Sequence, residues 1–176
     1  MGKPIIRRVA QRMRIIGVDP GLNRTGYAVI DDLGGRWIAV EGGVSRPDPS
    51  DPLELRVRAI YRDIREVLEE FKPAAMALEE LHSRYEFPKT AILMGHARAA
   101  VCLAAAECEI PVTGYAPSRV KNAVTGSGAA TKEQVQKAIV TQLRLASPPK
   151  PFDVADAFAL AICHAMVAAS PIARVK

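Results

Sequence analysis

The chain has 176 residues, of which 49% are hydrophobic and 24% are charged, and its formal net charge is +5. This length and composition are typical of one soluble globular domain with a buried core. The sequence contains no apolar run of the roughly 18 residues needed to cross a membrane, and the basic N-terminus lacks the apolar stretch of a signal peptide. Cys102, Cys108 and Cys163 lack metal-ligand spacing, so we predict reduced thiols in a cytoplasmic protein without a membrane partner.

The positive charge is unevenly distributed along the chain. Residues 1–12 contain four basic residues and no acid, whereas the rest of the chain has 20 basic against 19 acidic residues. Net charge alone therefore does not predict a nucleic-acid partner, and only local clusters of Lys and Arg support one. We predict a disordered basic extension over residues 1–12, a folded domain over 13–169 and a tail over 170–176. Whether the extension is native, artificial or a nucleic-acid-binding arm is open.

The first strong structural signal lies between residues 15 and 30. Residues 15–19 have strand character, Pro20 and Gly21 form a turn, and residues 25–30 are a second strand, which together predict a β-hairpin. Asp19 ends an otherwise apolar strand, where an unpaired carboxylate is costly. It therefore either accepts hydrogen bonds from amides of the turn or lies beside a bound cation.

The remaining elements follow from hydrophobic periodicity and from turn residues. Ser118 is predicted to cap a short helix, and Thr131 with Gln134 has the spacing of a capping box. In chain order we predict a strand over 36–43, an amphipathic helix over 53–71, a buried strand over 74–80, a loop over 81–89, an Ala-rich helix over 90–109, a strand over 111–116, a short helix over 118–124, a glycine-containing loop over 125–130, a helix over 131–145 and a last helix starting at 153.

Three antiparallel strands followed by alternating helices and strands predict an α/β fold. Its five-stranded mixed sheet is flanked by helices, and this order of elements is that of the ribonuclease H-like fold.

Further acidic residues occupy the ends of the predicted elements. Glu79 and Glu80 end a strand, and neighbouring side chains of a strand point to opposite faces, so only one of them faces the site of Asp19. The pattern does not say which one. Asp153 and Asp156 are three residues apart and share a helix face. Taken alone, Asp153 as a helix cap and Asp156 as an acid near the positive helix end explain this pair without catalysis.

Four carboxylates at one place would repel each other strongly unless cations neutralised them. Hard oxygen ligands suit Mg²⁺ or Mn²⁺. A pair of such ions roughly 3.5–4 Å apart can activate a water and stabilise the leaving oxygen in phosphodiester hydrolysis. The sequence has no zinc-spaced histidines, no Gly-x-Ser-x-Gly and no Walker-type loop, so no other catalytic arrangement competes.

Three segments resemble the RuvC family of bacterial Holliday-junction resolvases: IGVDPGLNRTGY from Ile16, ALEE from Ala77 and DVADAFALAI from Asp153. Each motif alone is weak, but together, in order and at family-like spacing over about residues 13–168, they are highly specific. The resemblance implies a homodimeric, Mg²⁺-dependent endonuclease that nicks four-way DNA junctions symmetrically in recombination and DNA repair. It also implies two Mg²⁺ ions per site, for which Mn²⁺ can substitute, and the RuvA–RuvB branch-migration complex as a partner.

The same resemblance implies the roles of individual residues. The catalytic metal ligands would be Asp19, Glu79, Asp153 and Asp156, and the lysines near the scissile phosphate would be Lys121 and Lys132. The resemblance thus selects Glu79 over Glu80. Lys132 also stands out physically, because a cation in the first turn of a helix is disfavoured by the helix dipole. Its alternative role is a solvated lysine beside Glu133.

One departure from the family concerns the loop after the strand at 74–80. Many members resemble Glu-x-x-Phe there, with an aromatic residue that presses on junction bases, whereas this chain has His82 and a segment about one residue longer. His82 and Tyr85 are our candidates for base stacking, and Phe87 is the better core candidate. Arg84 and Lys89 are predicted to contact DNA.

Three other functions compete with this interpretation of the sequence. An actin-like or sugar-kinase ATPase shares Gly-x-Asp-x-Gly and Thr-Gly but needs roughly twice this length. A ribonuclease H-like RNA-processing nuclease of the YqgF type shares the Asp-x-Gly start, although the acids of the last helix and the Gly-Ser-Gly loop before Lys132 favour the resolvase. A non-catalytic junction-binding module is disfavoured, because binding a polyanion would improve without the four carboxylates.

Overall fold

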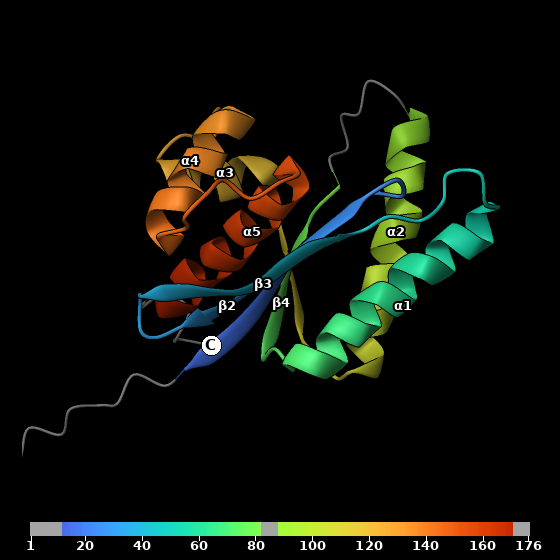
Figure 1. Cartoon of the computed structure of the whole chain (residues 1–176), viewed down its shortest axis with the longest axis horizontal. Helices are drawn as coiled ribbons and strands as arrows, with labels where there is room; N and C mark the ends of the chain where they lie inside the picture. The colour runs from blue at the N-terminus through green and yellow to red at the C-terminus, as the bar shows by residue number, and fades with distance from the viewer. Residues whose placement is uncertain (1–11, 82–87, 171–176) are drawn as a thin grey trace, which may run out of the picture.

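A five-stranded mixed sheet forms the centre of the molecule (Figure 1). The computed structural model describes residues 12–81 and 88–170. The strands are β1 (Met13–Asp19), β2 (Thr25–Asp32), β3 (Trp37–Ser45), β4 (Ala75–Glu79) and β5 (Val112–Tyr115). Their order is β3-β2-β1-β4-β5. The pairs β1–β2 and β2–β3 are antiparallel, whereas the pairs β1–β4 and β4–β5 are parallel. The predicted mixed sheet, with three antiparallel strands first, is confirmed.

Helices cover both faces of this sheet (Figure 1). The helices on one face are α1 (Leu53–Phe71) and α2 (Pro88–Glu107), and those on the other are α3 (Pro117–Thr125), α4 (Lys132–Leu143) and α5 (Phe152–Ala169). Alternate strand residues serve the two layers, as expected for a strand buried on both faces. In β1, Ile16 and Val18 belong to the core under α1 and α2, whereas Ile15 belongs to the core under α5.

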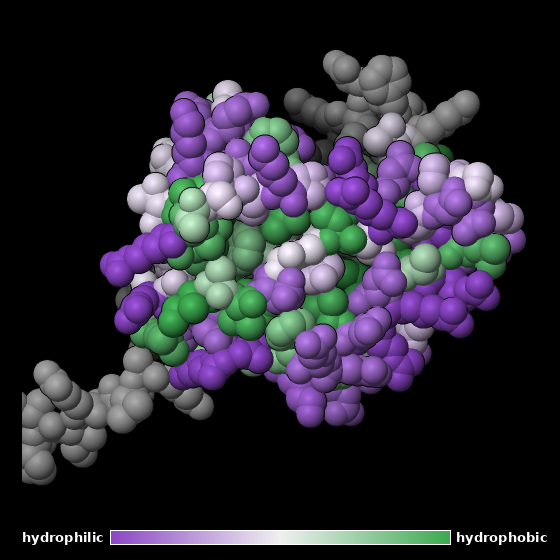
Figure 2. Space-filling view, in the orientation of Figure 1, coloured by the Kyte–Doolittle hydropathy of each residue, from purple (hydrophilic) through white to green (hydrophobic). Residues whose placement is uncertain are grey.

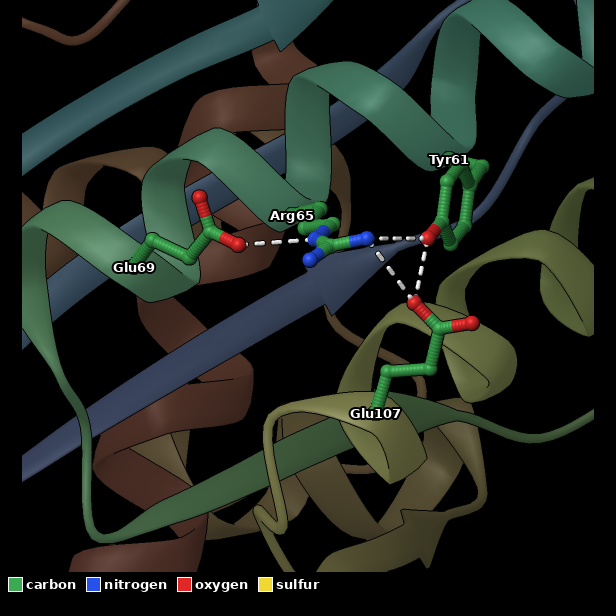
Figure 3. A network of polar contacts seen from close by, with 4 residues as sticks. All are labelled: Tyr61, Arg65, Glu69 and Glu107. Atoms are coloured by element: carbon green, nitrogen blue, oxygen red, sulfur yellow. Dashed lines mark hydrogen bonds and ion pairs between the residues drawn. The ribbon is translucent and has the colours of Figure 1, made fainter.

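Helices α1 and α2 also contact each other through a polar network on their outer surface (Figure 3). The Arg65 guanidinium donates to the Glu69 carboxylate at 2.7 Å, to the Tyr61 hydroxyl at 2.8 Å and to the Glu107 carboxylate of α2 at 3.1 Å. The Tyr61 hydroxyl donates to Glu107 as well. Exposed ion pairs of this kind contribute little to stability, because solvent screens them. The buried side chains of α1, which include Ile60, Ile64 and Leu68, provide most of its stabilisation.

Helix α5 lies unusually close to β1 and β2 because glycines face it. A Cβ atom at Gly17 would lie 2.0 Å from the Ala157 carbonyl oxygen, and one at Gly26 would lie 2.4 Å from the Asp153 carbonyl oxygen. No side chain fits in either place. The two glycines therefore fix how deeply the first turns of α5 settle on the sheet.

Helix α5 also corrects one prediction. It is the one helix in the described residues that is long and apolar enough to cross a membrane by length and composition, with a mean hydropathy of 1.6 over Phe152–Ala169. The claim that no segment reaches this limit was wrong. The fold explains the composition, because α5 packs across the middle of the sheet and between α3, α4 and the strands. A helix buried on most sides is apolar on most sides.

Helix starts agree with the sequence in one case and not in another. Thr131 and Gln134 form the predicted capping box at the start of α4. Ser118 does not cap α3, whose N-cap is Ala116 and whose first residue is Pro117. Proline starts a helix well, because its φ is already helical and the missing N–H has no partner in a first turn.

Most other boundaries fall within two residues of the prediction. Helix α2 is Pro88–Glu107 instead of 90–109, so Lys89 lies in its first turn and not in the preceding loop. The three cysteines are free thiols, as predicted. Seen from the side of β3, the surface is hydrophilic mainly over the helices, with hydrophobic side chains interspersed over the sheet (Figure 2).

Candidate active site

A cavity of about 440 Å³ opens where β1 and β4 end. Its charged lining comprises four acids and three bases: Asp19, Glu79, Asp153, Asp156, Arg24, Lys121 and Lys132. The structure thus places all six residues predicted to be catalytic around one cavity. Arg24 is the additional charged residue, which the sequence analysis missed.

The sheet positions the first two acids. Strands β1 and β4 are parallel neighbours with Val18 opposite Leu78, so the next residues, Asp19 and Glu79, lie side by side at the strand ends. Each acid lies two residues beyond a small residue on the α5 side of the sheet, Gly17 in β1 and Ala77 in β4. Side chains two residues apart on a strand share a face, so both carboxylates point towards α5.

Glu80 points elsewhere. It does not line the cavity, and a Cβ atom at Gly114 of β5 would lie 2.7 Å from a carboxylate oxygen of Glu80. Of the two glutamates that the sequence pattern left undecided, Glu79 is therefore the one beside Asp19.

Helix α5 brings the other two acids. Gly26, the cross-strand partner of Asp19, lies directly beneath Asp153, so the close approach of the helix sets Asp153 above the end of β1. Asp156 follows almost one turn later on the same helix face. The alternative that Asp153 caps the helix is wrong, because the N-cap is Pro151 and no side chain caps this end.

The central acids are strongly perturbed. Burial, with the charges of Asp156 and Asp153, raises the pKa of Asp19 to about 7. Burial also raises the pKa of Glu79 to about 8, with Asp19 and Asp156 adding to the effect and Lys132 and Lys121 opposing it. In residues 12–81 and 88–170, neither central acid has a salt bridge. Near neutral pH, these carboxyls therefore keep protons in the absence of a cation, and a bound cation would displace those protons.

The outer acids have cationic partners. Lys132 Nζ lies 3.5 Å from Asp156 Oδ2, and Arg24 Nε lies 4.0 Å from Asp153 Oδ2. Burial still raises the pKa of Asp156, against the opposing effect of Lys132. Both cationic side chains are more than half exposed, at 61% for Lys132 and 54% for Arg24. The pocket thus combines two half-buried acids at the strand ends, which form its floor, with two acid–base pairs at its rim.

This donor set fits hard divalent cations. Among the described residues, no three His, Cys, Asp or Glu side chains stand in a ready-made metal-binding group. The carboxylates surround the cavity instead, and the raised pKa values of Asp19 and Glu79 show how poorly the negative charges there are neutralised without a cation. Mg²⁺ is commonly held in this way, by one or two carboxylates, waters and substrate phosphates.

The residues predicted to contact DNA are not tested by the structure. His82, Arg84, Tyr85 and Phe87 lie outside the described residues, as does the side chain of Lys89. The choice of a stacking residue among them stays a prediction.

The chain is similar to known proteins over most of its length. The sequence matches the family described as crossover junction endodeoxyribonuclease RuvC over residues 15–164. It is 50% identical over 158 residues to the RuvC of Rhodopirellula baltica, covering 90% of this chain and 89% of that protein. It is 43% identical over 164 residues to the RuvC of Desulforamulus reducens, covering 93% and 100%. The chain belongs to the RuvC family.

Solved structures agree with this RuvC assignment. RuvC of T. thermophilus in complex with a Holliday junction substrate superimposes with a TM-score of 0.84 at 37% identity, covering 89% of this chain and 95% of that one. The yeast mitochondrial Holliday junction resolvase Ydc2, at 15% identity and a TM-score of 0.59, shares the fold. The predicted ribonuclease H-like fold is confirmed. As a RuvC-family protein, the chain is a metal-dependent endodeoxyribonuclease that hydrolyses phosphodiester bonds, and the YqgF alternative is not favoured.

Proposed function

We propose that this RuvC-family endonuclease resolves four-way (Holliday) DNA junctions by paired, symmetric nicks in recombination and DNA repair. The main support is that four carboxylates and three basic side chains, from segments far apart in the sequence, line one cavity. The T. thermophilus relative, similar over 89% of this chain, is described in complex with such a junction.

The four carboxylates are proposed to hold two Mg²⁺ ions, for which Mn²⁺ can substitute. Bound in such a site, the ions would make water a stronger nucleophile and stabilise the leaving oxygen. Asp19 and Glu79 lie at the floor of the cavity and lose their protons when cations bind. The sheet holds both carboxylates in position, because each residue ends a strand. Asp153 and Asp156 complete the site from α5, which is held at its depth by Gly26.

Lys121 and Lys132 are proposed to hold the phosphate that reacts. Both line the cavity, and both depress the raised pKa of Glu79, so their charges reach its floor. Lys132 is the first residue of α4. The backbone N–H groups of the first helical turn point out of the same N-terminal end of the helix. A helix N-terminus with a lysine is a suitable seat for a phosphate.

Paired nicks need two active sites, and we propose that a homodimer supplies them. Helix α2 exposes apolar side chains on its outer surface, with Ile92 at 60%, Leu103 at 53% and Leu93 at 43% exposure. A two-fold dimer uses the same patch on both copies. An Ala-rich helix with a few large apolar residues suits close packing against its own copy.

A cytoplasmic location, cooperation with RuvA–RuvB and the three predicted domain segments are proposed from family membership and the sequence.

The deciding experiment compares a labelled four-way junction with a linear duplex of the same arm sequence, with Mg²⁺ and with EDTA. We expect nicks at symmetric positions on two opposed strands of the junction, only with Mg²⁺, and much weaker cutting of the duplex. Equal cutting of both substrates would refute junction resolution. Preferential cutting of structured RNA would instead favour RNA processing.

A further inference from the structure

Arg24 occupies a position that mirrors that of Lys132. Each side chain is long, more than half exposed and placed at the rim of the cavity, and each faces one of the two outer acids. Lys132 is paired with Asp156 and Arg24 with Asp153. In the cation-free protein the rim of the pocket is thus neutralised by the protein's own bases.

The loop that carries Arg24 is braced on both sides. The buried Thr25 hydroxyl donates to the Gly21 carbonyl at 2.9 Å and accepts from the Gly21 amide at 3.3 Å, which closes the turn after β1. From α1, the Arg56 guanidinium donates to the Leu22 carbonyl at 3.3 Å and to the Asn23 side chain. The backbone of Arg24 is therefore held in place, and only its side chain has freedom to change partner.

Arg24 and a divalent cation compete for the same carboxylate. A carboxylate that ligates a cation no longer carries a free charge for Arg24, and a half-exposed ion pair at 4.0 Å is weak enough to exchange. A released guanidinium at the rim would be left beside a more positive cavity. The group that suits it best there is a phosphate, which arginine binds through two parallel N–H donors.

We propose that Arg24 is a cation-released DNA-binding residue: it pairs with Asp153 in the cation-free pocket and binds a backbone phosphate once a divalent cation occupies Asp153. This inference rests on the proposed function, because it assumes that the cavity receives cations and DNA. It makes DNA binding and cation binding mutually supportive through one side chain. Lys132 and Asp156 offer the same geometry, but Lys132 already has a proposed role at the reacting phosphate.

The test measures junction binding at equilibrium and not cleavage. Fluorescence anisotropy records the affinity of an intact four-way junction in EDTA and in Ca²⁺, which occupies hard oxygen sites with a looser geometry than Mg²⁺. For the wild type we expect tighter binding in Ca²⁺. Arg24→Gln should match the wild type in EDTA but bind roughly tenfold more weakly in Ca²⁺. Its salt dependence in Ca²⁺ should also fall by about one phosphate contact.

Two further variants sharpen the comparison. Arg144→Gln removes another exposed positive charge, at the far end of α4 and roughly 18 Å along the helix from Lys132, and should leave the Ca²⁺ effect unchanged. Arg24→Lys should recover part of it. Without DNA, Arg24→Gln should bind Mn²⁺ roughly two- to fivefold more tightly, because a competitor is gone. Damage to the fold would weaken the binding of both Mn²⁺ and DNA. Tighter Mn²⁺ binding together with weaker junction binding in Ca²⁺ therefore identifies the exchange of partners by Arg24.

The failure of the inference is separable from that of the proposed function. If Arg24→Gln keeps the full Ca²⁺ effect, or weakens binding equally in EDTA and Ca²⁺, the exchange does not occur. If the wild type shows no Ca²⁺ effect, the exchange is refuted as well. If the wild type does not prefer a four-way junction to a linear duplex, junction resolution fails, and the same comparison on the duplex still decides the role of Arg24.

Discussion

Two half-buried carboxyls at the floor of the pocket, those of Asp19 and Glu79, make the stability of the cation-free protein sensitive to pH. The pKa values of Asp19 and Glu79 are raised to about 7 and about 8, chiefly by burial. The native state therefore holds protons that the unfolded chain has released. The stability linked to them is fully present below about pH 4 and is lost as the pH rises through about 7 and 8.

We therefore expect the melting temperature of the protein in EDTA to fall between pH 5 and pH 8, by roughly 5 °C or more. Mg²⁺ should reduce the fall, because a bound cation stabilises the ionised carboxylates. Differential scanning calorimetry at several pH values, with and without Mg²⁺, measures both effects. The double variant Asp19→Asn, Glu79→Gln is the control and should show a smaller pH dependence. An identical fall in that variant would mean that other groups cause it.

Neighbouring glutamates at the end of β4 should differ sharply in function. Glu79 lines the cavity, whereas Glu80 lies against Gly114 of β5. We expect Glu79→Gln to lower the nicking rate by roughly 100-fold or more while junction binding persists, because a charge that acts at the reacting centre is removed. Glu80→Gln should stay near the wild-type rate. Single-turnover cleavage and anisotropy on the same junction measure the two properties, and the reverse ranking would contradict the placement of Glu79.

At the scale of elements, the depth of α5 on the sheet controls the geometry of the site. Gly17→Ala would put a Cβ atom 2.0 Å from the Ala157 carbonyl oxygen, so the helix must move. Overpacking of this kind typically costs about 1–3 kcal/mol. We expect a melting temperature lower by roughly 2–12 °C and slower nicking, because α5 carries Asp153 and Asp156. Thermal melts and cleavage assays test this.

Gly95→Ala is the matched control for that substitution. Gly95 lies within α2, and a Cβ atom there would meet nothing closer than 3.8 Å. In a helix, alanine is favoured over glycine by up to about 1 kcal/mol, so this variant should be as stable as the wild type or more so. Equal destabilisation by the two substitutions would show that close packing at Gly17 is not the cause.

Several elements were predictable because their signals are local. The periodicity of α1 and the capping box of α4 depend on residues within a few positions, and both appear as predicted. The predicted start of α3 is wrong because two local signals compete there: Ser118 is a good N-cap residue, but Pro117 is a good first helical residue, and the helix begins at Pro117. The facing of Glu79 also had an overlooked signal. Small residues alternate with large ones in β4, and Ala77 lies on the face where the close approach of α5 leaves little space. Glu79, two residues later, lies on the same face.

At the scale of the whole molecule, the site depends on contacts that no local pattern contains. Asp19 and Glu79 are brought together by a parallel strand pair, and Asp153 reaches them through the contact of α5 with Gly26. Family resemblance supplied the identity of these acids in advance. It did not supply the pairing of Arg24 with Asp153, because that depends on the depth of a helix on a sheet and on the reach of an exposed side chain.

Symmetric nicking requires two copies of the active site, and therefore depends on how two subunits assemble. If the outer surface of α2 forms the dimer, a charge there should separate the subunits without disturbing the pocket. Ile92→Glu and Leu103→Glu each place a carboxylate on a strongly exposed part of that surface. A buried charge at the centre of an interface typically costs 2 kcal/mol or more, so we expect the dimer affinity to fall by roughly 30-fold or more.

The expected result in sedimentation velocity is a monomer at concentrations where the wild type is a dimer. On the four-way junction, the variants should release products with a single nick, because two sites no longer act within one complex, whereas Mn²⁺ binding should remain at the wild-type level. Leu53→Glu, at the start of α1, changes another exposed apolar residue, at 39% exposure; it is the control and should stay dimeric. If the α2 variants remain dimeric and nick both strands together, the subunits meet elsewhere, and the exposed apolar side chains of α2 serve another contact.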